Sequence, residues 1–255
     1  MYLGLAEIVQ LPRIIGMQNS KSTLTLRGIS SMATKAILAD LAKAYHAQSG
    51  VTLDIASVGG VDAAKRVQAG EAFDVVLLAS DAIDRLIASG HVQTGSRCDW
   101  VNSPVAVAVQ SGAAHPDIRS EASLKAAVLA APTLSYSTGP SGVYLEKLFE
   151  RWGIAEQVKP RIVVPPPGTP VGALVANGQV ALGFQQLSEL ISVKGLDVVG
   201  NLPSDVAYIT TFSSGIPVAV AQDTARQQAV QQFLQFLASA EVEPVKRQQG
   251  MTWVA

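Results

Sequence analysis

The chain has 255 residues, of which 48% are apolar and 15% charged, and its formal net charge is −1. This composition supports a folded core and excludes an intrinsically disordered chain. The near balance of 19 basic and 20 acidic residues gives no sign of a clustered basic surface, so no nucleic-acid partner is expected. No apolar stretch approaches the roughly 18 residues of a membrane-spanning helix.

The first half of the chain alternates apolar runs with amphipathic segments. Strands are predicted at residues 23–26, 51–55 and 74–79, each followed by a helix, at residues 33–49, 62–69 and 81–89. The run at 74–79 is almost wholly apolar, which is typical of a central parallel strand. This alternation predicts an α/β fold with a parallel sheet.

The alternation of strands and helices is interrupted at residues 103–110, a predicted strand without a helical crossover after it. Strands are then expected at 133–136, 161–164 and 180–185, with helices at 123–129, 142–152 and 172–177. Two further strands, at 210–212 and 216–221, precede an amphipathic helix at 224–239. Because the second unit interrupts the first, we predict two lobes joined by two crossing strands. Lobe I comprises residues 23–103 plus 210–255, lobe II comprises 104–209, and residues 1–22 form an N-terminal extension.

Four loops of small, polar or glycine-rich residues each lead from a predicted strand into a predicted helix. In chain order they contain Ser30 and Ser31; Gly59, Gly60 and Val61; Gly139, Ser141, Gly142 and Tyr144; and Pro170 and Val171. A helix N-terminus presents unpaired N–H groups and a partial positive charge, so it favours anions. Ligands of open α/β sheets bind beyond the carboxyl ends of the strands, which predicts an anion site between the lobes. The competing interpretation is that these residues are ordinary helix caps.

No metal or cofactor site is expected. The single cysteine, Cys98, cannot form an internal disulfide, and it is interpreted as an inert thiol. The three histidines are dispersed and lack the spacing of metal ligands. The sequence also contains neither a dinucleotide-binding nor a P-loop motif.

From about residue 23 to its end, the chain resembles the molybdate-binding component of bacterial ABC importers. The resemblance is carried by ISSMATKAILADLAKAYHAQSGV, VQAGEAFDVVLLASDAIDRLIASG, GPSGVY and PVGALVANGQVALGF. It implies a two-lobed type II periplasmic binding fold, in which each lobe is a mostly parallel sheet flanked by helices and a two-strand hinge joins them. It also implies a small anion in the interlobe cleft, an ABC permease partner and a periplasmic location. We expect a monomer, and no signal peptide is visible in residues 1–22.

The resemblance assigns roles to individual residues. Ser31 falls on the serine that binds an oxyanion after the first strand. Ser141 falls on a backbone contact to the ligand, and Pro170 or Val171 falls on the next one. These assignments would place donors from both lobes around a single anion.

The chain departs from that family at two of the expected contacts. The turn at Gly59 and Gly60 replaces the second oxyanion-binding serine, and Gln186, next to Gln185, stands where the family uses a tyrosine hydroxyl. The stretches GFQQLSEL and GPSGVY are similar to a branch of the family that contains aconitate isomerase. Because a site built to hydrogen-bond one ligand discriminates against others, an organic carboxylate becomes an alternative to molybdate.

Three classes of function follow. The first is a solute-binding protein for a small oxyanion or carboxylate, with Arg27, Lys35 and Arg66 as candidate cations. The second is an aconitate isomerase-like enzyme that shifts a proton on a tricarboxylate, with Tyr144, Lys35 or Asp62 as candidate base. The third is a ligand-sensing regulator, which is disfavoured because the first 22 residues are too short for a DNA-binding helix-turn-helix.

Overall fold

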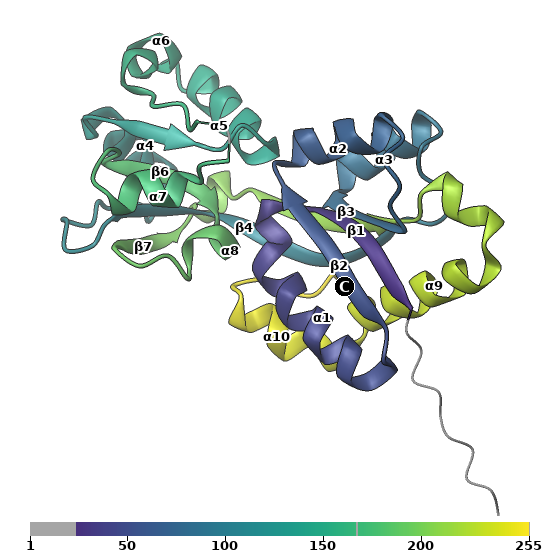
Figure 1. The fold of residues 1–255 in the computed structure, drawn as a ribbon. Helices are drawn as coiled ribbons and strands as arrows, with labels where there is room; N and C mark the ends of the chain where they lie inside the picture. Colours follow the sequence, from purple (N-terminus) through teal and green to yellow (C-terminus); the bar gives the residue numbers. More distant parts are fainter. Residues whose placement is uncertain (1–23, 167, 255) are drawn as a thin grey trace, which may run out of the picture.

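A computed structural model describes residues 24–166 and 168–254, apart from the side chain of Ala221 (Figure 1). The predicted N-terminal extension, residues 1–22, lies outside the described residues. None of the described helices is long and apolar enough to cross a membrane.

The first part of the chain alternates strands and helices as predicted. Its elements are β1 (Thr25–Ser31), the 3-10 turn η1 (Met32–Thr34), α1 (Lys35–Ser49), β2 (Thr52–Val58), α2 (Gly60–Gln68), β3 (Val75–Ala79), α3 (Ser80–Ala88) and β4 (Cys98–Gln110). Helix α1 buries Ile37, Leu38, Leu41 and Tyr45 on one face. It ends at Gly50, whose φ of 75° suits glycine and whose N–H donates to the His46 carbonyl at 2.8 Å.

The remaining elements alternate less regularly. They include α4 (Glu121–Ala130), β5 (Leu134–Tyr136), α5 (Pro140–Arg151), α6 (Ala155–Val158), α7 (Val171–Ala176), β6 (Leu182–Gln186), α8 (Leu187–Leu190), β7 (Leu196–Asn201), β8 (Ile209–Gly215), the 3-10 helix η4 (Val218–Gln222), α9 (Thr224–Ala238) and α10 (Glu243–Gln248). A reciprocal capping box between Ser120 and Ser123 starts α4, and the Asp223 side chain accepts from the Arg226 N–H at the start of α9.

Eight strands form one continuous sheet in the order β2-β1-β3-β8-β4-β6-β5, with β7 paired to β4. Strand β1 runs parallel to β2 and β3, and β5 runs parallel to β6. Strand β8 is antiparallel to both β3 and β4, which confirms a mixed α/β fold. The 13-residue strand β4 pairs with β8 over residues 98–104 and with β6 over residues 105–108. Helices α2 and α3 lie on one side of the β1–β3 sheet, and α1, α9 and α10 lie on the other (Figure 1).

The buried apolar side chains form two core regions. The first core region comprises two clusters from residues 26–101 and 212–251, including the fully buried Trp100 and Phe233. The second core region comprises two clusters from residues 105–206, including Phe149 and Phe184. Strands β4 and β8 connect the two regions. This partition agrees with the expected lobes, whose boundaries stay a prediction.

The structure corrects two predicted strands. Of residues 161–164, only Ile162 makes a β-bridge, to Leu134. Residues 216–221 are not a strand either, because Pro217 makes a single bridge to Val92 and the chain then turns into η4. Proline has a fixed φ and no N–H, so it ends the ladder that its apolar neighbours would otherwise extend.

Candidate functional site

The carboxyl end of β1 carries two serines that face different surroundings. Ser30 is fully buried, and its hydroxyl lies 2.8 Å from the Ser57 hydroxyl at the end of β2. Ser31 is 7% exposed, and its Oγ is a buried atom without a hydrogen-bond partner among the described residues. The two side chains diverge because successive strand residues point to opposite faces. Ser31 therefore presents an unpaired hydroxyl, whereas Ser30 joins β1 to β2.

Helix α2 starts beside Ser31. Gly59 is its N-cap and Gly60 its first residue, and a Cβ added to Gly60 would lie 3.8 Å from the Ser31 Cβ. The following residue, Val61, is 52% exposed. The register of β1 with β2 causes this proximity, because Ser31 pairs with Val58 immediately before the turn. The structure thus brings Ser31 and the glycine turn together, as the sequence predicted.

The carboxyl end of β6 carries a second unpaired polar atom. Gln186 is 4% exposed, and its Nε2 donates to the Thr210 hydroxyl at 2.6 Å. Its Oε1 is buried and has no partner within the described residues. Strand pairing places Val105 opposite Gln186 and Ser103 opposite Thr210, so this amide lies where β4 passes from one core region to the other.

A hydrogen bond between the two core regions brings these strand ends together. The Ser188 hydroxyl, two residues beyond Gln186, donates to the Ala33 carbonyl at 2.8 Å, and Ala33 is two residues beyond Ser31. The hydroxyl oxygens of Ser103 on β4 and Ser188 are 3.5 Å apart. The ends of β1 and β6 are therefore neighbours, and each supplies one buried polar atom without a partner.

Gln185 is placed differently from its neighbour. Its Oε1 accepts from the Gly172 N–H in the first turn of α7 at 3.0 Å, and its Nε2 donates to Glu189 at 2.8 Å. Both ends of the amide are thus committed inside the second core region. The prediction that Gln185 donates to a ligand receives no support from this geometry, whereas Gln186 keeps a free end.

Glu189 is the carboxyl that accepts from Gln185, and sequence reasoning did not single it out. Desolvation by burial raises its pKa to about 7, and the hydrogen bond from Gln185 opposes this rise. A pKa near neutrality is a property of groups that exchange protons under physiological conditions. The only available sequence signal was a glutamate three residues after Gln186, which is also the ordinary pattern of a first helical turn.

The turn from β5 into α5 forms a compact structure of its own. Gly139 is the N-cap of α5, its carbonyl accepts from the Gly142 N–H at 3.0 Å, and the Ser141 hydroxyl lies 2.8 Å from that of Ser137. Ser141 is 2% exposed. Within the described part of the chain, no hydrogen bond joins this turn to Ser31 or Gln186. Its role in ligand binding stays a prediction.

Pro170 and Val171 occupy the start of α7 as expected. Pro170 is the N-cap, and Val171, the first residue of α7, is 1% exposed. The neighbouring Gly172 N–H is already bound by Gln185. The backbone contacts predicted here are therefore limited to the helix start ahead of Gly172, and they stay a prediction.

The Tyr144 hydroxyl already makes a hydrogen bond within the protein. It donates to the Val206 carbonyl at 2.9 Å, and its ring stacks on Tyr208 with centroids 4.5 Å apart. Burial raises the pKa of Tyr144. A general base must offer a free lone pair at a suitable pKa. A protonated phenol that donates its hydrogen bond to a backbone carbonyl does not meet this requirement. The geometry favours a packing role for Tyr144 over the predicted catalytic one.

The three candidate cations differ in whether another residue already binds them. Arg66 makes a bidentate ion pair with Glu71, at 2.6 and 2.5 Å, and Arg27 lies 3.9 Å from the same carboxylate. Both guanidinium groups also lie over the Phe73 ring. Lys35, in contrast, is exposed at the start of α1, directly after η1, and forms no ion pair with any described residue. Lys35 is the predicted cation that remains available to an anion near Ser31.

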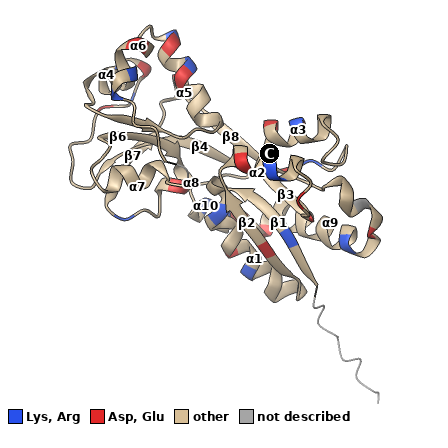
Figure 2. Ribbon diagram, turned by 45° about the horizontal axis from the view of Figure 1, so that its top comes forward, with Lys and Arg blue, Asp and Glu red and all other residues tan. Residues whose placement is uncertain are grey.

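Basic and acidic residues are interspersed along the helices (Figure 2). Asp62, one of the candidate bases, is exposed in the first turn of α2, where the helix dipole favours a carboxylate. Among the described residues, no group of three or more histidine, cysteine, aspartate or glutamate side chains is arranged to hold a metal ion.

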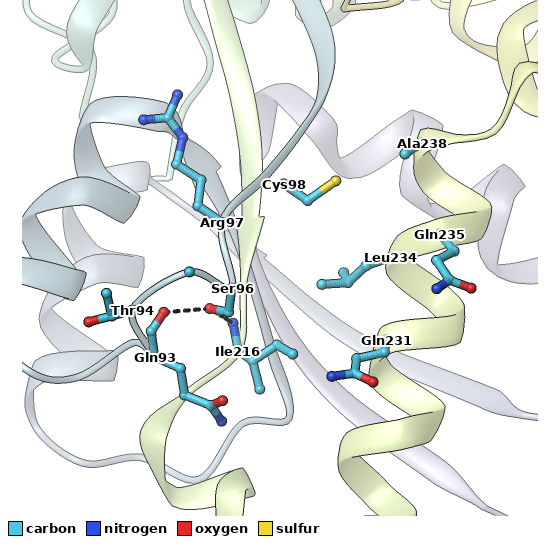
Figure 3. A pocket seen from close by; sticks show the side chains of 11 residues that line it. Gln93, Thr94, Ser96, Arg97, Cys98, Ile216, Gln231, Leu234, Gln235 and Ala238 are labelled. Carbon is cyan, nitrogen blue, oxygen red and sulfur yellow. Dashed lines mark hydrogen bonds between the residues drawn. The ribbon is translucent and has the colours of Figure 1, made fainter.

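Two described cavities lie elsewhere. The larger, about 460 Å³, lies between residues 93–98 and α9 and is lined by none of the predicted ligand-binding residues (Figure 3). Its Arg97 is bound by Asp84 and Asp99, and burial raises the pKa of the Cys98 thiol. The smaller, about 190 Å³, adjoins Ser137 at the start of the α5 turn. The larger cavity therefore offers an anion no unpaired cation.

Comparisons with known proteins agree with this architecture. A curated relative, the aconitate isomerase of a Pseudomonas species, is 37% identical over 235 residues, covering 89% of this chain and 87% of the relative. The periplasmic molybdate-binding protein of Azotobacter vinelandii matches 90% of this chain and 99% of its own, with a TM-score of 0.72 and 18% identity. The tungstate-binding protein of Desulfovibrio alaskensis matches 91% of this chain and all of its own, with a TM-score of 0.66 and 14% identity.

The two solved structures establish the shared fold, which is that of periplasmic binding proteins, as the sequence predicted. The family described as bacterial extracellular solute-binding proteins matches residues 26–252, nearly the whole of the described chain. On the family match and the 37% identity, the chain belongs to the bacterial extracellular solute-binding proteins.

Proposed function

We propose that this protein binds a small organic carboxylate, of the tricarboxylate class, at the meeting point of β1 and β6. The observation that carries the proposal is that two of the four buried side-chain atoms without a partner among the described residues, Ser31 Oγ and Gln186 Oε1, lie at neighbouring strand ends. A buried polar group without a hydrogen bond is costly, so such a pair is typical of a site that a ligand completes. Ser31 offers a hydroxyl donor, and Lys35 adds positive charge nearby.

Gln186 suits an anion through a rotation of its amide. Amide oxygen and nitrogen exchange places when the group turns by 180°, and the Thr210 hydroxyl accepts in one arrangement and donates in the other. The rotated amide directs two N–H donors toward the ligand. A carboxylate is favoured over molybdate because the 37% identical relative is an aconitate isomerase. The two departures from the molybdate-binding pattern also fall at positions where that pattern predicts ligand contacts.

The wider arrangement belongs to the same proposal. Lobe I, residues 23–103 plus 210–255, and lobe II, residues 104–209, would hold the anion in the cleft between them and close by bending at the crossing strands. Backbone donors near Gly59, Gly60, Ser141 and Val171 would complete the contacts. A monomeric periplasmic protein of this kind would deliver its ligand to an ABC permease.

Calorimetric titration tests the proposal directly. We expect cis- or trans-aconitate to bind, and Ser31→Ala and Gln186→Ala each to weaken binding by about 1–3 kcal/mol, roughly 5- to 150-fold in Kd. The exposed Ser89→Ala and Gln231→Ala serve as matched controls and should leave affinity unchanged. Binding of molybdate or tungstate alone would overturn the carboxylate assignment, and full affinity in both site variants would overturn the site.

The second candidate function is an aconitate isomerase-like reaction, which the 37% identical relative favours. The reaction removes a proton from carbon next to one carboxylate and returns a proton at the other end of the allylic system. We expect Tyr144→Phe to retain most turnover, because the lost hydroxyl is bound to Val206. Chromatography of cis- and trans-aconitate after incubation measures this. Loss of turnover with unchanged melting temperature and ligand affinity would instead assign Tyr144 as the base.

A further inference from the structure

Tyr208 precedes β8 directly and lies on the same face of the sheet as Gln186. Val105 of β4 is the register partner of Gln186, and its N–H donates to the Tyr208 carbonyl at 2.9 Å. Residues paired across neighbouring strands share a face, and so do residues two apart in one strand. Tyr208 therefore faces the same way as Gln186 and as Thr210, whose hydroxyl accepts from the Gln186 amide at 2.6 Å.

The ring of Tyr208 packs on the start of α5. It stacks on the ring of Tyr144 with centroids 4.5 Å apart and planes 18° apart. Tyr144 follows Ser141 by three residues in the same helix, so the stack rests on the α5 turn that the sequence assigns to the site. No hydrogen bond joins this turn to Gln186 among the described residues, and Tyr208 is the side chain that links the two places.

The hydroxyl end of Tyr208 lies between the two core regions. Burial raises the pKa of Tyr208, the charge of Asp81 raises it too, and a hydrogen bond with the Thr210 side chain opposes the rise. Asp81 is in the first turn of α3, in the first core region, whereas Tyr144 belongs to the second. The raised pKa keeps the phenol protonated near neutral pH, so it has a hydrogen to donate.

This hydrogen has a choice of acceptors once a ligand is present. It turns about the C–O bond of Tyr208, so it points either at the Thr210 oxygen or away from it. A carboxylate is a stronger acceptor than a neutral hydroxyl. With the Gln186 amide rotated toward the ligand, Thr210 gives its own hydrogen to Gln186, and the phenol hydrogen is left for the ligand.

We propose that Tyr208 is a ligand-contacting residue of this site and that its phenol O–H donates a hydrogen bond to one carboxylate of the bound tricarboxylate. The inference rests on the proposed function, because it assumes a carboxylate next to Gln186. The donor stands between Gln186 and the α5 turn, so it selects ligands that carry a carboxylate at that place. Sequence reasoning did not single out Tyr208, because the register of β4 with its two neighbours brings it to the site.

Calorimetric titration with cis- and trans-aconitate tests the proposal on variants of the full chain. Tyr208→Phe keeps the ring that stacks on Tyr144 and removes only the hydroxyl. It should weaken binding by about 10- to 100-fold and leave the melting temperature unchanged. Tyr208→Leu removes the ring as well, so it should bind no more tightly and melt at a lower temperature. The control is Tyr136→Phe, which removes a half-buried hydroxyl that donates to Glu146 at 3.3 Å and should keep wild-type affinity.

Protein labelled with carbon-13 at the tyrosine Cζ reports the contact directly by NMR. The Tyr208 resonance is the one that is missing from the Tyr208→Phe spectrum. It should move when aconitate saturates the site, because the carbon that bears the hydroxyl senses its hydrogen bond, while the Tyr136 resonance stays in place. A Tyr208 resonance that does not move would overturn the inference, and so would wild-type affinity in Tyr208→Phe with a loss in Tyr208→Leu alone.

Failure of the proposed function gives a different result. If neither aconitate isomer binds the wild type, the proposed function is wrong and this inference is wrong with it. If aconitate binds and both Ser31→Ala and Gln186→Ala weaken binding while Tyr208→Phe does not, only the role of Tyr208 is wrong.

Discussion

Gly142→Ala should destabilise the protein by about 3 kcal/mol or more and weaken any ligand contact made by the α5 turn. A Cβ at this position would overlap the Ser137 carbonyl oxygen and lie 2.9 Å from its carbonyl carbon. A flexible side chain could move aside, but a backbone carbonyl cannot do so without opening the turn. The Gly142 N–H is bound to the Gly139 carbonyl at 3.0 Å, so this hydrogen bond would be lost as well. Urea denaturation measures the change.

Gly139→Ala is the matched control for this prediction. Its φ of −87° is available to alanine, and the nearest side-chain atom to an added Cβ is the Ser137 Oγ at 3.8 Å. We expect its stability to stay within about 1 kcal/mol of the wild type. Equal stability of Gly142→Ala and the wild type would contradict the close approach that the structure shows at the start of α5.

Asp74→Ala should cost about 3 kcal/mol, the second largest effect that we expect. The Asp74 side chain is 9% exposed, and its Oδ2 accepts from the Arg27 N–H and from the Arg226 guanidinium, both at 2.7 Å. It thereby joins the start of β3 to β1 and α9. Truncation would leave a half-buried guanidinium without its counter-charge and a backbone N–H without its acceptor. Differential scanning calorimetry should show a lower melting temperature.

Two comparisons isolate the causes of this loss. Asp74→Asn keeps an acceptor of the same shape, so it should recover part of the stability. Asp223→Ala removes only the cap of α9 and the 3.7 Å pair with Arg226, so it should cost about 1 kcal/mol. If Asp74→Ala proves as mild as Asp223→Ala, the ion pair to Arg226 contributes little beyond a surface contact.

The sequence was sufficient to predict the fold class, because the apolar runs of strands and the three-to-four spacing of amphipathic helices are easily told apart. It was also sufficient to place Ser31 beside the Gly60 turn, since the ends of neighbouring parallel strands meet at one edge of the sheet. Its assignment of Ser31 and Gln186 as ligand contacts stays a prediction, now accompanied by their unpaired buried atoms.

The alternation of polar and apolar residues along a strand could not show that Gln186 and Gln185 have different surroundings. Every residue of β6 is buried, so neither face carries the polar pattern that fixes the phase of a strand. The raised pKa of Glu189 was hidden for a related reason, because its cause is burial in the folded protein rather than a feature of the local sequence. Strand β7 was missed because its apolar run, Val198 and Val199, is too short to show a period.

The position of β8 has a consequence for how the protein forms during synthesis. This strand lies in the sheet between β3 and β4, yet the chain reaches it only after the whole second core region. A nascent chain that ends near residue 200 therefore exposes the edges of β3 and β4, and it lacks Phe233 and the rest of α9 in its first core. All residues of the second core region would have left the ribosome before those of the first, because the first core region also needs α9. The edges of β3 and β4 therefore stay unpaired until residues 209–215 have left the ribosome.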